Sequence, residues 1–183
     1  MTAVRSAAVG ALVGAALVLA ACGSASPGGR LVAPDAVPTE LVPPTLEGNL
    51  TLGEYLPGRQ AFAQAGPASL VSDGRLWAIR RGETLVGTLQ ISTVKRDVSV
   101  TSPRDHQAIL DGVMTGISYQ TVDVGGIKVA ASSSADRTLY LWFGPKLFEV
   151  LQLKGTRVDP DSVAADVISY QLSTGRLGTV SPS

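Results

Sequence analysis

Residues 138 to 153 read TLYLWFGPKLFEVLQL, and this segment is the most informative about the architecture of the protein. Two apolar runs, 138–143 and 147–153, flank Gly144-Pro145-Lys146, and this pattern predicts an antiparallel hairpin. The first run carries large apolar side chains on both of its faces. They are Tyr140 and Trp142 on one face, and Leu139, Leu141 and Phe143 on the other. Because a strand with two apolar faces must be covered on both sides, we expect it in the middle of a sheet between two layers.

Two more hairpins and two helices are predicted on the N- and C-terminal sides of this stretch. The strands are expected at Leu76–Arg81, Thr84–Lys95, Tyr119–Val124 and Ile127–Ser132, the last two joined by Gly125-Gly126. Each helix is predicted to start at a capping residue followed by proline, as in Ser102-Pro103 and Asp159-Pro160. The order ββα-ββ-ββα predicts a single α+β domain, an antiparallel sheet with two packed helices.

The unit of a hairpin followed by a helix occurs twice. Leu85, Leu89 and Gln90 match Leu147, Leu151 and Gln152 at a constant offset of 62 residues. Two interpretations stay open: an ancient duplication, or two amphipathic hairpins that look alike because the pleat of a sheet imposes the same alternation.

The overall composition excludes several classes of function. Fifteen basic and fifteen acidic residues leave no net charge, so a nucleic-acid partner is not expected. The hydrophobic content of 45% excludes a wholly disordered chain. One cysteine excludes a disulfide framework, and one histidine leaves little for metal binding. The sequence contains no nucleotide-binding glycine motif, and we expect no cofactor.

The N-terminus carries an uncharged run, Ala7–Ala21, which is too short to span a bilayer but fits the core of a signal peptide. The run ends in Leu19, Ala20 and Ala21, followed by the single cysteine, Cys22. This ending resembles the lipobox of bacterial lipoproteins. The resemblance implies that Cys22 receives a diacylglyceryl group and, after cleavage, anchors the chain to the outer face of the cytoplasmic membrane in the cell envelope. The alternative is an ordinary secretory signal with an incidental cysteine.

Proline and glycine content divides the rest of the chain. We expect a signal peptide at residues 1–21, a lipidated, disordered linker at 22–46, an α+β domain at 47–174 and a disordered tail at 175–183. The excess of arginine over lysine is typical of high-GC bacteria such as actinobacteria. In architecture alone, the domain is similar to the Mog1/PsbP-like folds of some actinobacterial lipoproteins.

The residues that could carry function are few. His106 has Asp105 beside it, but neighbours on a helix do not face each other, and no G-x-S-x-G motif is present, so we expect no enzyme. Four aromatic residues form either core or a ligand or partner surface, and core is favoured because large aromatics dominate burial. They are Trp77, Tyr140, Trp142 and Phe148.

The function expected from these features is that of a non-catalytic binding or accessory module for an envelope protein. One alternative is a lipid or small-molecule carrier, which requires an apolar cavity. A second alternative is an envelope hydrolase, which requires His106 to meet an acid and a hydroxyl such as Ser132, Ser133 or Ser134.

Overall fold

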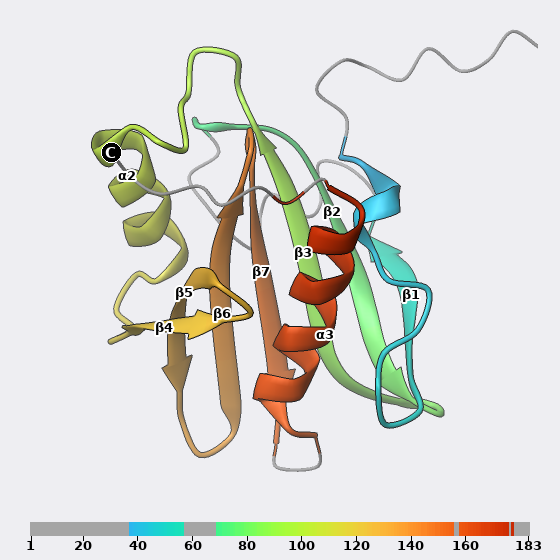
Figure 1. Ribbon diagram of the computed structural model, residues 1–183. Helices are drawn as coiled ribbons and strands as arrows, with labels where there is room; N and C mark the ends of the chain where they lie inside the picture. The colour runs from blue at the N-terminus through green and yellow to red at the C-terminus, as the bar shows by residue number, and fades with distance from the viewer. Residues whose placement is uncertain (1–36, 57–68, 156–157, 176, 178–183) are drawn as a thin grey trace, which may run out of the picture. The chain divides into compact units, whose positions relative to one another are not determined.

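A seven-stranded antiparallel sheet with a helix on each face forms the domain in the computed structural model, which describes residues 37–56, 69–155, 158–175 and 177 (Figure 1). The strand order is β1-β2-β3-β7-β6-β5-β4. The strands are β1 (Leu50–Leu56), β2 (Val71–Arg81), β3 (Thr84–Val94), β4 (Gln120–Val124), β5 (Ile127–Ser133), β6 (Arg137–Gly144) and β7 (Leu147–Lys154), and the helices are η1 (Thr39–Leu41), α2 (Pro103–Val113) and α3 (Pro160–Ser173). The predicted α+β class, with its antiparallel sheet and two packed helices, is confirmed.

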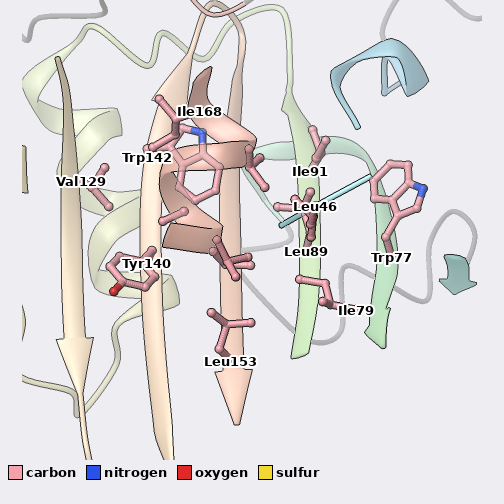
Figure 2. Close-up of a cluster of buried hydrophobic side chains, with 14 of the residues drawn as sticks. Leu46, Trp77, Ile79, Leu89, Ile91, Val129, Tyr140, Trp142, Leu153 and Ile168 are labelled. Atoms are coloured by element: carbon pink, nitrogen blue, oxygen red, sulfur yellow. The ribbon is translucent and has the colours of Figure 1, made fainter. Parts of the chain in front are cut away.

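The hairpin of β6 and β7 lies inside the sheet, as its two apolar faces predicted. Tyr140 and Trp142 belong to the hydrophobic cluster under α3. Leu139, Leu141 and Phe143 belong to a second cluster, under α2. Figure 2 shows Tyr140, Trp142 and Leu153 in the α3-side cluster, together with Ile168 of α3. The alternation along one strand therefore supplies both cores of a three-layer α/β/α arrangement.

The two helix starts are built differently. At α3, the carboxylate of Asp159 accepts a hydrogen bond from the backbone N–H of Asp161 at 3.2 Å, so the predicted cap is confirmed. At α2, proline occupies the first turn as predicted, but Ser102 makes no side-chain capping bond. Asp105 instead accepts from the N–H of Ser99 at 2.9 Å and fixes the loop before the helix.

The ordered domain begins earlier in the chain than the sequence predicted. Val37, Leu41 and Leu46 are buried in the α3-side cluster, and η1 forms there. The linker prediction for 22–46 is therefore wrong over residues 37–46, because apolar side chains between the prolines reach the core. Leu177, in the predicted tail, is buried as well. Cys22, Leu19, Ala20 and Ala21 lie outside the described residues.

Strand β1 was not predicted at all. It reads LTLGEYL, and it pairs antiparallel with β2 from Leu50↔Arg81 onward. Its alternation is interrupted by Gly53 and Glu54, so its apolar period is too short to be recognised without the neighbouring strand.

Candidate functional site

An open cleft of about 580 Å³ lies between the β4–β5 hairpin, strand β6 and the first turns of α3. Its walls and floor combine polar and apolar side chains from four elements. The lining residues are Gln120, Val122, Asp123, Val124, Gly125, Ala131, Ser132, Ser133, Thr138, Tyr140, Pro160, Asp161 and Ala165. The volume falls in the range of small-ligand sites. We call this feature the α3 cleft.

The cleft exists because the β4–β5 hairpin bends toward α3. Its turn, Gly125-Gly126, has φ values of +60° and +86°, as a tight primed turn requires. A methyl group added at Gly125 would lie 3.6 Å from Cγ2 of Ile168 on α3. The turn thus abuts the middle of the helix, and the space left toward the helix N-terminus is the cleft.

A hydrogen bond between Tyr140 and Asp161 joins the floor of the cleft to its helical wall. The Tyr140 hydroxyl donates to Oδ1 of Asp161. The tyrosine side chain is 3% exposed, whereas Asp161 is exposed. Burial, and then the neighbouring Asp161 carboxylate, raise the pKa of Tyr140 well above its usual range. Tyr140 therefore stays a neutral donor that fixes the orientation of the carboxylate.

The charged residues in the lining of the cleft are acidic, but the Asp123 side chain alternates with Val122 and Val124 and therefore faces away from α3. Among the described residues that line it, Asp123 and Asp161 are acidic and none is Lys, Arg or His. Asp123 is partly neutralised by Lys128, whose Nζ lies 3.1 Å from Oδ2 at an exposed position. That bond, and a second from the N–H of Gly126, lower the pKa of Asp123. Ser133 and Thr138 add hydroxyls that hydrogen-bond each other at 3.2 Å.

The four predicted aromatic residues form core and not an exposed surface. The exposed fractions are 6% for Trp77, 3% for Tyr140, and 0% for both Trp142 and Phe148. Only Tyr140 contributes to the α3 cleft, through its hydroxyl edge. Among the described residues, the exposed large hydrophobic side chain is Tyr119, which immediately precedes β4.

His106 occupies a structural position. Its ring stacks on Phe143 with centroids 3.8 Å apart, and its Nδ1 lies 3.1 Å from the carbonyl oxygen of Val100. The serines considered as its partners are engaged elsewhere or line the α3 cleft: Ser133 bonds Thr138, and Ser134 bonds Asp136. The described hydrogen bonds do not join His106 to an acid or to a hydroxyl.

Sequence reasoning missed a buried polar cluster under α3. Glu149 is 0% exposed, and its Oε2 accepts from Nε2 of Gln171 at 2.7 Å. The same amide nitrogen donates to the carbonyl oxygen of Leu41 at 3.1 Å, and Nε1 of Trp142 donates to Oε1 of Gln171 at 3.3 Å. Oε1 of Glu149 has no partner. The sequence did contain a sign of this cluster, because Glu149 is a lone acidic residue inside an apolar strand pattern.

Burial raises the pKa of Glu149 to about 8, against the opposing effects of the hydrogen bond from Gln171 and of the neighbouring Trp142 indole N–H. The carboxyl group is therefore mostly protonated at neutral pH. The Glu149 side chain lies in the core between the sheet and α3, and it does not line the cleft.

Two features are absent from the ranges that the structure describes. No helix there is long and apolar enough to cross a membrane. No group of three or more His, Cys, Asp or Glu side chains there is placed to hold a metal ion. Comparisons with protein families, with curated proteins and with solved structures found no match for this chain.

Proposed function

We propose that this protein is a membrane-anchored extracytoplasmic lipoprotein that acts as a non-catalytic binding module for an envelope protein. The observation that carries the proposal is the contrast between two filled cores and an open edge. Trp142, Leu151 and Ile168 in one core, like Leu141 and Phe148 in the other, are 0% exposed. The surface around β4, in contrast, is exposed and includes the α3 cleft.

Strand β4 has the properties of an edge that accepts another strand. It ends the sheet, so one side of its backbone pairs with no described strand. Its ladder with β5 is regular over five consecutive pairs, and its sequence QTVDV contains no proline and a single charged residue, Asp123, which is paired with Lys128 of β5. The opposite edge strand, β1, has a register shift between Glu54 and Leu56. A partner segment can add to β4 through main-chain hydrogen bonds, and exposed Tyr119 extends the contact.

Crosslinking in intact cells tests the protein partner. A photoreactive amino acid replaces Tyr119, and, as a matched control, exposed Glu83 in the β2–β3 turn. We expect one defined protein adduct from position 119, identified by mass spectrometry, and none from position 83. Adding Thr121→Lys should reduce the adduct, because a charged edge resists strand addition. Equal adducts at 119 and 83, or no effect of the lysine, would contradict edge binding.

The anchor has its own test. Lipidation needs the Cys22 thiol, and two or more acyl chains are required for stable membrane binding. Cys22→Ala in the full chain should move the protein from the membrane fraction to the soluble fraction, whereas Ser24→Ala should leave it in membranes. Membrane retention of the Cys22→Ala variant would rule out the lipoprotein assignment.

A small-molecule carrier is the second candidate, and the volume of the α3 cleft favours it. A lipid carrier fits less well. The α3 cleft is lined by the Asp161 carboxylate and several hydroxyls, which an acyl chain would desolvate without replacing their hydrogen bonds.

A further inference from the structure

The lining of the α3 cleft identifies the chemistry of its ligand, and this inference goes beyond the protein partner proposed above. The polar groups converge on one space from separate elements: Gln120 from β4, Thr138 from β6 and Asp161 from α3. Between them lie small apolar surfaces, chiefly Val122 and Ala165. We propose that the α3 cleft binds a neutral polyhydroxylated ligand, a glycan segment of one or more sugar rings.

The charge of the cleft lining disfavours anionic ligands. The Asp161 carboxylate lies at the cleft and none of the described lining residues is a cation, whereas the Asp123 carboxylate is bound by Gly126 and Lys128 on the other face of β4. Phosphate, carboxylate or sulfate groups would therefore meet the like charge of Asp161 without a lining cation to compensate it. Acidic glycans, nucleotides and anionic lipid headgroups are accordingly disfavoured as ligands.

The donors and acceptors of the lining favour a ligand with hydroxyl groups. An ionised carboxylate only accepts hydrogen bonds, and a hydroxyl both donates and accepts. Asp161 is already held by the Tyr140 hydroxyl at Oδ1, so its other oxygen is oriented before any ligand arrives. A ligand with many hydroxyl groups supplies donors to Asp161 and matches the hydroxyls of Ser133 and Thr138.

The lining of the cleft also combines polar and apolar surface. A sugar ring has polar hydroxyls at its rim and C–H groups on its faces. The apolar lining at Val122, Val124 and Ala131 suits the faces, while the polar side chains suit the rim. An aliphatic chain would leave the polar groups without hydrogen-bond partners, and a fully charged ligand would make no favourable contact with the apolar surface.

Direct binding measurements with the full chain, purified in detergent, test the inference. The neutral probes are the tetrasaccharides of mannose, glucose and N-acetylglucosamine. A uronic acid tetramer serves as the anionic probe and a glucosamine tetramer as the cationic probe. We expect at least one neutral probe to bind with a Kd of about 1 mM or tighter, and the uronic acid tetramer not to bind. No neutral binding at about 10 mM, or binding of only the charged probes, would overturn the proposal.

Matched variants place the binding in the cleft. Ala165→Phe should fill it and abolish binding, whereas Ser169→Phe on the exposed side of α3 should not. Thr138→Val and Asp161→Asn should each weaken binding by about tenfold, as expected for one hydrogen bond lost to a ligand. Thr84→Val removes a comparable exposed hydroxyl elsewhere and should change nothing. Unaltered binding by Ala165→Phe would contradict the site, while crosslinking at Tyr119 remains a separate test of the protein partner.

Discussion

Glu149 is the only acidic or basic side chain that is buried in the part of the chain that the structure describes. The elements packed around it are β3, β6, α3 and η1, which present apolar groups, the Gln171 amide and the Trp142 indole. No charged group contributes to its pKa, which burial raises to about 8. The folded state therefore favours the neutral acid, whereas an unfolded chain holds the same group ionised at neutral pH.

This difference makes stability fall as pH rises. Between the ordinary pKa of 4.5 and the folded value of about 8, the folded state holds one more proton than the unfolded state. The contribution of Glu149 to the free energy of unfolding should therefore be fully present below about pH 4.5 and decrease by about 1.4 kcal/mol per pH unit up to about pH 8. Urea unfolding at pH 5, 6, 7 and 8 measures this slope.

Glu149→Gln should remove most of that slope, because the amide has the same shape and never ionises. We expect the variant to be at least as stable as the original at pH 8. Glu83→Gln, an exposed change, should keep the original slope. A wild-type stability that is flat from pH 5 to 8 would show that Glu149 does not ionise with a raised pKa.

At the scale of elements, β3 and β7 approach each other closely at Gly87. A Cβ on Gly87 would overlap the backbone carbonyl oxygen of Gln152 and lie 2.6 Å from Cδ2 of Leu153. Gly87→Ala should therefore force the two strands apart and cost about 1–3 kcal/mol of unfolding free energy. Gly53→Ala on β1, where nothing lies within 4 Å, is the matched control and should be nearly neutral. Thermal and urea unfolding compare them, and equal losses would contradict the close approach.

The repeated hairpins are related in the sheet, but their helices are not. Leu89 and Leu151, matched by the offset of 62, are direct cross-strand partners in β3 and β7, and both face α3. A twofold axis normal to the sheet would relate the hairpins in this way, and it would also place both helices on one face. The helices lie on opposite faces, since α2 packs in one cluster and α3 in the other. The similarity between the two hairpin-and-helix units is therefore limited to their strands and does not extend to their helices.

Local patterns predicted most elements because their signals are short-range. The strand alternation, the turn at Gly125-Gly126 and the cap at Asp159 all act within a few residues, and the structure has each of them. The α3 cleft could not be predicted in this way. Tyr140 and Asp161 look like a core residue and a capping residue in sequence, and only the packing of α3 on β6 makes them partners.

At the scale of the whole molecule, the segment from Val37 to Leu46 belongs to the domain. Leu41 is 1% exposed, and its carbonyl oxygen accepts from Gln171 of α3, 130 residues away in sequence. The N–H of Val37 also donates to Asp73 on β2 at 3.3 Å. These contacts close a long loop of chain onto the centre of the α3-side core.

Leu41→Ala should therefore destabilise the whole domain by about 2–5 kcal/mol, as in other buried leucine truncations. Pro44→Ala, at an exposed position in the same segment, should cost much less. Urea unfolding of the full chain measures both. Near-equal stability of the two variants would show that residues 37–46 do not stabilise the domain and belong to the linker.

The attachment of η1 also decides how the domain carries mechanical load. If the chain is anchored at Cys22 as proposed, a pull on the domain enters at Val37, whose N–H bonds Asp73 of β2, and then reaches Leu41. The force then meets the Gln171 hydrogen bond and the Leu41 side chain packed in the core, beside the central strands and α3. It does not begin at edge strand β1, which could be peeled from the sheet one hydrogen bond at a time. Tension on the anchor would thus pull η1 out of the core first. Only afterwards would it disturb β4 and the α3 cleft, where binding is proposed.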